Sequence, residues 1–410
     1  MKLKSPEMIF VILAFVFGCV FLFITPFNEV PDEQAHLMRA CEVADGILYG
    51  KNTPILTTKC DELIKRDILL TRPKDAFYGA SGYSPILYTF PALGLKLGEV
   101  WGGKTMFYFA RLFNLFAFIL LTAWAIRITP VFKYQFLIVA LLPMTLYEGM
   151  SISADSINNA VAFLFFAYLF KLIFSNKNNL SPKELVSLVA LSSLGAMLKG
   201  LVYPIFLFIF LPIQRNKNIF IMLCLIIAVG IMCCWSAINP VFTYPDPLMS
   251  ASFNKYVLLH NPLNFLCKFI NTLIYRGYWY IPSCIGVLGL LKVLLYPAYF
   301  IEPILFISSF FVFPTNVSKN NRIVALLIFV AFTVFMHIMF YINWTLPSSS
   351  RIEGVQGRYF IPMLPLLFLV FAQNKIKISS QNQNKYILIL IFAIFITLVY
   401  SVFALHNYFM

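Results

Sequence analysis

The residues best suited to chemistry stand directly after the first long apolar run of the chain. Asp32 and Glu33 open a predicted helix that ends near Gly46. His36 and Arg39 follow at spacings of three or four residues, so their side chains share a face of that helix with the acids. One interpretation is a carboxylate that acts as a base or metal ligand at a membrane surface, since a helix N-terminus favours the ionised form. The other is a solvated helix start with a capping acid.

Three basic residues lie within or at the ends of apolar runs: Arg111, Lys199 and Arg358. A charge in the middle of a bilayer costs about 2.5–3.5 kcal/mol, so such residues usually face a cavity and a partner. Two structural pairings are open, Arg111 with Asp155 and Arg358 with Glu353. The alternative is that the bases bind a shared anion, most simply a lipid-linked phosphate.

Further polar and aromatic residues map close to these acids and bases. Asp155 follows a short polar turn, where it either caps the next helix or supplies a second acid. Gln356 lies in a Gly-Val-Gln-Gly run whose backbone amides could approach an anion. Tyr83 and Tyr203 are either aromatic residues of the membrane interface or rings that stack on a sugar.

The composition defines the environment in which these residues work. Of 410 residues 60% are hydrophobic and only 12% charged, and the mean hydropathy is +0.82. An ordinary soluble domain is nearer one quarter charged, so a soluble enzyme, a disordered chain and a nucleic-acid-binding module are excluded. The net charge of +14 fits basic cytoplasmic loops that face anionic lipid. The composition therefore predicts an all-α, multi-pass membrane protein.

Apolar runs predict about eleven membrane-spanning helices in one integral membrane domain that covers residues 1–410. Two shorter apolar stretches, 85–99 and 281–292, are predicted to be interfacial helices on the outer surface. The predicted spans are 8–26, 106–127, 134–150, 156–174, 185–198, 200–213, 219–238, 293–313, 323–343, 359–372 and 386–406.

The distribution of Lys and Arg orients these spans. With the N-terminus in the cytoplasm, every cytoplasmic loop is short and basic, as the positive-inside rule requires. The loops 27–105, 239–292 and 344–358 are then extracytoplasmic and contain the candidate chemistry. Cys41 and Cys60 fall in the first of them, where a disulfide is one of two open outcomes.

Five stretches together resemble a bacterial multi-span membrane-protein family of unknown function. More distantly, they are similar to the GT-C superfamily of membrane glycosyltransferases, which includes protein O-mannosyltransferases and the aminoarabinose transferases of lipid A. The stretches are PDEQAHLMRACEVADG, YSPILYTFPALGLKLG, ARLFNL, LPMTLYEGMSISADSINNA and GVQGRYFIPMLP.

The resemblance implies a GT-C-like bundle in the bacterial cytoplasmic (inner) membrane and a transferase that uses a sugar linked to polyprenyl phosphate. By this resemblance Asp32 or Glu33 is the catalytic carboxylate, and Lys199, Arg111 and Arg358 are candidates to bind the donor phosphate. The acceptor would be a surface glycan, such as an O-antigen, a lipid or a protein. No cofactor is required by the sequence, and a divalent metal ion stays open.

Two other functions compete with a glycosyltransferase. A transporter or flippase of lipid-linked glycans would also bind phosphate, but it would carry broken or charged helices along a path through the membrane. A polymerase or ligase of surface polysaccharide would rely on a large outer loop rich in Arg, which 239–280 is not. The acids gather on one side, which favours a one-sided enzyme.

Overall fold

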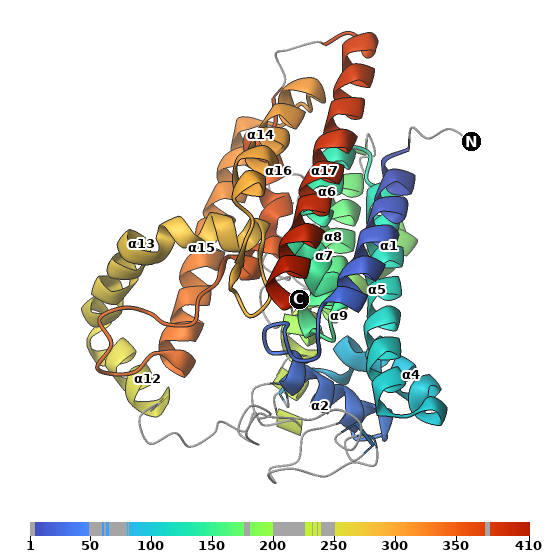
Figure 1. Cartoon of the computed structure of the whole chain (residues 1–410). Helices are drawn as coiled ribbons and strands as arrows, with labels where there is room; N and C mark the ends of the chain where they lie inside the picture. Colours follow the sequence, from blue (N-terminus) through green and yellow to red (C-terminus); the bar gives the residue numbers. More distant parts are fainter. Residues whose placement is uncertain are drawn as a thin grey trace.

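The computed structural model describes residues 5–48, 60, 63–64, 80, 82–175, 181–199, 226–231, 233–235, 237–238, 251–373 and 378–410. In these residues the chain is almost entirely helical, as the composition predicts, and most helices run side by side in one bundle (Figure 1). Lys199 is the last described residue before residues 200–225, so the predicted span 200–213 and Tyr203 lie outside the described residues, as does the side chain of Lys199.

The N-terminal half of the described chain contributes the helices that surround the candidate site. They are α1 (Pro6–Ile24), α2 (Glu33–Ala44), η2 (Pro85–Tyr88), α4 (Thr89–Gly98), η3 (Glu99–Trp101), α5 (Gly103–Ile128), α6 (Lys133–Ala140), α7 (Pro143–Met150), α8 (Ala154–Ile173) and α9 (Pro182–Lys199).

The C-terminal half packs against this group and extends to one side of it (Figure 1). Its elements are α12 (Ala251–His260), α13 (Pro262–Ile285), β1 (Val287–Leu288), β2 (Val293–Leu294), α14 (Tyr296–Val312), α15 (Lys319–Trp344), η5 (Gly357–Met363), α16 (Leu364–Phe371) and α17 (Ser380–Phe409).

Within the described residues, the helices α1, α5, α8, α15 and α17 are long and apolar enough to cross a membrane. Their surroundings differ sharply: 89% of the most apolar stretch of α8 is buried inside the protein, against 22% in α15. Large apolar side chains such as Phe392 and Leu388 of α17 are exposed, which water would disfavour and lipid would accept. The bundle therefore has α8 at its centre and α15 and α17 at its rim.

The α4–α5 pair is packed unusually closely through two glycines. A Cβ atom at Gly94 would lie 2.4 Å from the carbonyl oxygen of Phe109, and one at Gly98 would lie 2.6 Å from the Cα atom of Met106. This Gly-x-x-x-Gly spacing is the pattern that lets two helices approach backbone to backbone. It holds the predicted helix 85–99, confirmed here as η2, α4 and η3, against the first turns of α5.

Several predicted boundaries were wrong, each for a local reason. The predicted span 134–150 is two short buried helices, α6 and α7, because Pro143 interrupts the hydrogen bonding between them. The predicted interfacial helix 281–292 ends at Ile285 and is followed by a hairpin that pairs Val287 with Leu294. The described part of the predicted loop 239–280 consists of two helices, α12 and α13, with Asn261 between them.

The span predicted at 359–372 is also divided. A 3-10 segment, η5, precedes α16 because Pro362 and Pro365 disrupt a continuous α-helix. These differences share one cause: a run of apolar residues reports burial, and it does not by itself report where hydrogen bonding breaks.

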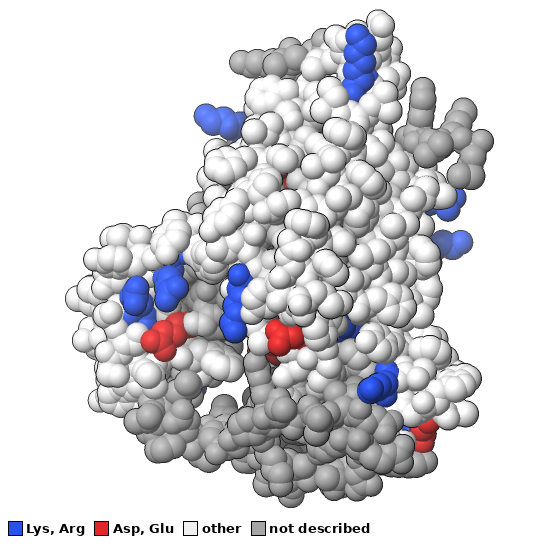
Figure 2. Space-filling view, viewed as in Figure 1, with Lys and Arg blue, Asp and Glu red and all other residues white. Residues whose placement is uncertain are grey.

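Two ends of the bundle can be distinguished. Tyr134 stacks on Phe313, Phe313 contacts Tyr386, and the backbone N–H of Thr315 donates to the carbonyl of Gln373, so these connections meet at one end. We call it the basic end, because its described charged residues include Arg127, Lys133, Lys319, Arg322 and Lys385. The opposite end, which we call the α2 end, contains α2, α4 and the start of α8. On the face in Figure 2, a largely uncharged band separates Lys and Arg at the upper end from mixed charges in the lower half.

Candidate functional site

Asp32 is the accessible carboxylate of the acidic pair. It is the residue immediately before α2 and adopts a left-handed backbone conformation, φ 62°, which Asp tolerates better than most residues. Its side chain is 61% exposed, and its Oδ2 atom accepts a hydrogen bond of 2.7 Å from Nη2 of Arg358. A buried cation thus holds an exposed anion at the α2 end of the bundle.

Arg358 lies between two carboxylates. Besides Asp32, its Nη1 atom is 3.7 Å from Oε1 of Glu148 in α7, and the side chains of Arg358 and Glu148 are 2% and 1% exposed. Asn159 of α8 donates to the other oxygen of Glu148 at 3.0 Å. The guanidinium group also lies 5.1 Å from the ring centre of Tyr359. The segment before α2 and helix α7 therefore fix the position of the guanidinium group, and α8 acts through Glu148.

The segment that carries Arg358 is anchored on α13. The backbone N–H of Gly357 donates to Oγ of Ser283 at 2.8 Å. A Cβ atom at position 357 would collide with the backbone carbonyl oxygen of Tyr280, so only glycine fits there. The Gly-Val-Gln-Gly run that we expected to approach an anion approaches α13 at this glycine.

Glu33 points in a different direction and forms a buried pair with Arg111. Nε and Nη2 of Arg111 donate to the two oxygens of Glu33 at 2.8 and 2.5 Å. Nη1 donates to the carbonyls of Leu22 and Thr25 at 3.1 and 2.7 Å, and Nη2 also donates to the carbonyl of Pro26 at 3.2 Å. All five N–H donors of this guanidinium group are occupied. Both side chains are fully buried.

The two ion pairs Arg111–Glu33 and Arg358–Asp32 correct two expectations from the sequence. Arg111 pairs with Glu33 rather than Asp155, and Arg358 pairs with Asp32 rather than Glu353. With no donor left, Arg111 has no hydrogen bond to offer a phosphate. Glu33 is equally engaged, because it also accepts from the backbone N–H of Ile152 at 3.1 Å. The geometry makes both residues structural.

The remaining polar residues of α2 also face inward. Nδ1 of His36 is 2.7 Å from the hydroxyl of Tyr88, and its ring centre lies 5.8 Å from that of Tyr83. Arg39 forms an ion pair with Glu42 and donates to the carbonyl of Leu48 at 2.8 Å. Burial raises the pKa of the Tyr88 hydroxyl well above its ordinary value. His36 and Arg39 therefore hold α2 in place.

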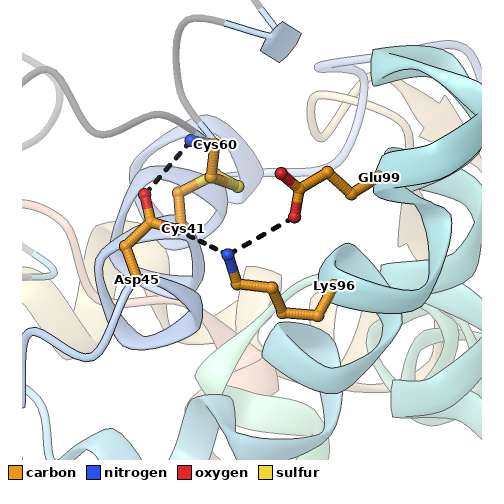
Figure 3. The surroundings of a disulfide bond; sticks show 5 residues. All are labelled: Cys41, Asp45, Cys60, Lys96 and Glu99. Atoms are coloured by element: carbon orange, nitrogen blue, oxygen red, sulfur yellow. Dashed lines mark hydrogen bonds and ion pairs between the residues drawn. A yellow bond between two sulfur atoms is a disulfide. The ribbon is translucent and has the colours of Figure 1, made fainter.

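Cys41 and Cys60 form a disulfide at the far end of α2 (Figure 3). Beside it, Asp45 accepts from the backbone N–H of Cys60 at 3.2 Å and from Nζ of Lys96 at 2.9 Å. The hydrogen bond to Asp45 raises the pKa of the Lys96 ammonium group. Because Lys96 belongs to α4, these contacts join the loop after α2 to the helix pair α4–α5.

Asp155 lies in the first turn of α8, 8% exposed, among the residues of this end of the bundle. It does not cap the helix: Ser153 does so, with its Oγ atom accepting from the backbone N–H of Asp155 at 3.0 Å. The negative charge of Asp155 reaches the Tyr88 hydroxyl. A role as second acid stays a prediction.

Glu148 was not identified as a site residue from the sequence. The signal was present, because an acid inside an apolar run is costly unless it has a partner. Among the described residues, no group of three or more His, Cys, Asp or Glu side chains is placed to hold a metal ion.

A comparison with known families places the chain. Residues 68–367, most of its length, match a family described as "Predicted membrane protein (DUF2142)". The chain belongs to this family. Together with the long apolar helices, this membership makes the protein a multi-pass membrane protein. The matched region of the DUF2142 family includes Glu148 and Arg358 and begins after Asp32. No curated protein and no solved structure matches the chain.

Proposed function

We propose that this DUF2142 protein is an inverting glycosyltransferase of the GT-C type. It would move a sugar from a polyprenyl-phosphate-linked donor to an acceptor hydroxyl on the extracytoplasmic face. The observation that carries the proposal is Asp32, an exposed carboxylate held at 2.7 Å by the buried guanidinium group of Arg358. A general base needs this combination of access to substrate and a fixed position.

The position of the site in the molecule supports the assignment. Short connections rich in Lys and Arg are retained on the cytoplasmic side of membrane proteins. The basic end has this character, and Asp32 lies at the opposite end. Nucleotide sugars are cytoplasmic, so a transferase that works on the outer face needs a donor carried by lipid.

The reaction is a single displacement. Asp32 accepts the proton of the acceptor hydroxyl while that oxygen forms a bond to the anomeric carbon of the sugar. The bond between the anomeric carbon and the phosphate oxygen breaks on the opposite side, and polyprenyl phosphate departs with the electron pair. A phosphate leaves readily, so one carboxylate suffices where glycosidases need two. A well-placed base contributes roughly 10²–10⁴-fold to the rate.

We assign Arg358 as the residue that positions Asp32, since its Nη2 atom already donates to that carboxylate. Cations on the departing phosphate would stabilise the transition state. Lys199, at the end of α9, stays our proposed ligand for the donor phosphate.

The test uses a bacterial strain from which the gene has been removed, complemented with variants. Asp32→Asn should abolish glycan modification, measured by mass spectrometry of surface glycans and of lipid-linked sugars, because the base is lost. Asp45→Asn is the matched control: this Asp follows the other end of α2 and is bound to Lys96. It should retain modification.

If the Asp32→Asn variant, at the same protein level, modified glycans as the wild type does, Asp32 would not be the base. If removal of the gene changed the sidedness of lipid-linked sugar while transfer continued, the protein would be a transporter and the proposal would fail.

A further inference from the structure

A cavity of about 330 Å³ lies between α13 and the segment 351–356. Its walls carry two guanidinium groups, Arg276 and Arg351, together with the rings of Trp279 and Tyr280 and the side chains of Glu353 and Gln356. The function proposed above uses none of these groups directly.

The charge of the cavity favours an anion. Among the described residues, no carboxylate lies within ion-pair distance of Arg276 or Arg351, although Glu353 is part of the same wall. Arg351 instead lies over the ring of Tyr275, 5.8 Å from its centre. An Arg that is not neutralised by the protein presents a fork of donors that suits a carboxylate or a phosphate oxygen pair.

The other lining groups favour a sugar over a simple ion. The Oε1 atom of Gln356 is buried and accepts no hydrogen bond from the described residues, which leaves an acceptor for a hydroxyl donor. Indole and phenol rings offer flat apolar surfaces on which the C–H face of a sugar ring packs. The described residues that line the cavity do not form a long aliphatic groove that would suit a polyprenyl chain.

The cavity and Asp32 are linked through the chain segment that joins Gln356 to Arg358. Gln356 is two residues from Arg358, and an extended chain advances at most about 3.6 Å per residue, so the two Cα atoms lie within roughly 7 Å. The guanidinium group of Arg358 then reaches Asp32. The segment that lines the cavity therefore continues directly into the residue that holds the proposed base.

We infer that this cavity binds a saccharide that carries a negatively charged group, a carboxylate or phosphate, and that this saccharide is the acceptor. The role of this saccharide as acceptor rests on the proposed function, whereas its binding can be measured without any transfer. Arg276 and Arg351 bind the anionic group, Gln356 accepts from a hydroxyl, and Trp279 packs on the ring.

The experiment measures binding of glucuronate, glucose and inorganic phosphate to the full chain in lipid nanodiscs, by saturation-transfer NMR and without donor. We expect glucuronate to bind more tightly than either glucose or phosphate. Arg351→Gln and Arg276→Gln should each weaken glucuronate binding about tenfold or more, because a charge-assisted hydrogen bond is lost. Arg276 is exposed, so its substitution leaves the fold intact. Arg322→Gln, at the basic end, is the matched control and should bind as the wild type does.

Three outcomes would overturn the inference: no saccharide binding, wild-type affinity for glucuronate in both Arg variants, or phosphate binding as tight as glucuronate binding, which would indicate an anion site only. Asp32→Asn separates this inference from the proposed function. It should still bind glucuronate, because Asp32 is not among the residues that line the cavity. A failure of transfer chemistry would then leave the binding result standing, and a failure of binding would leave the Asp32 test standing.

Discussion

Two adjacent acids of one motif have opposite environments. Asp32 precedes α2 in a left-handed conformation and its side chain is exposed, whereas Glu33 begins the helix and is fully buried against Arg111. A capping residue and the first residue of a helix point in different directions, so one residue can face solvent while the next enters the core. The first is suited to meet a substrate and the second to hold α1, α2 and α5 together.

Replacement of the buried acid should therefore affect stability. Glu33→Gln leaves the Arg111 charge buried without its carboxylate, and breaking a buried pair in this way costs about 3–5 kcal/mol. We expect a clear fall in the melting temperature of the purified protein in detergent, followed by fluorescence-detected size exclusion. Glu99→Gln removes one carboxylate from the partly exposed pair with Lys96 and should change stability by less than about 1 kcal/mol. A Glu33→Gln protein as stable as the wild type would contradict the structural role.

The sequence predicted the positions of charged residues on their helices better than it predicted their partners. Asp32 was predicted at a helix start because Pro and acidic residues mark the first turn. The partner of Asp32 is 326 residues away in the chain, so no local pattern could reveal it. The same holds for Arg111 and Glu33, which are 78 residues apart. Such pairs depend on how distant helices pack.

Elements at the α2 end are fixed by close backbone contacts as well as by side chains. The α4–α5 pair depends on Gly94 and Gly98, and η5 approaches α13 at Gly357. An apolar helix can be predicted from an apolar run alone. These backbone contacts, in contrast, form only where a residue has no side chain. This explains why α4 and α5 could be predicted from periodicity, whereas the contact of η5 with α13 could not.

The glycine of η5 gives a test at this scale. Gly357→Ala places a Cβ atom against the Tyr280 carbonyl and must shift the segment that carries Arg358. We expect a loss of about 1–3 kcal/mol from overpacking, and loss of glycan modification because Asp32 is no longer held. Gly277→Ala is the matched control: it lies in α13 with open space around it, and replacing a helical Gly by Ala stabilises by up to about 1 kcal/mol. Thermal unfolding and glycan analysis of both variants check the prediction. Equal behaviour of the two variants would refute it.

At the scale of the whole molecule, charge and hydropathy predicted the all-helical, multi-pass class and the separation of two ends. They did not predict the number of regular spans, because short helices such as α6 and α7 are buried by neighbours and need not cross a bilayer alone. Helix α13 shows the same limitation: its exposed Leu266, Ile270 and Ile274 share one face, yet the polar residues between them led us to expect a loop.

The proposed orientation predicts which ends a membrane-impermeant thiol reagent reaches in intact cells. Two exposed residues mark the two ends of α15: Asn320 at its start and Asn261, between α12 and α13, near its other end. The second placement follows because Asn254 of α12 donates to the carbonyl of Thr345, which directly follows α15. In a chain whose exposed free cysteines are replaced by serine, Asn261→Cys should be labelled from outside and Asn320→Cys only after the membrane is opened. The positive-inside rule gives this result, because Lys319 and Arg322 flank the second position. Labelling of Asn320→Cys alone in intact cells would reverse the orientation, and Asp32 would then face the cytoplasm, where a lipid-carried donor is no longer required.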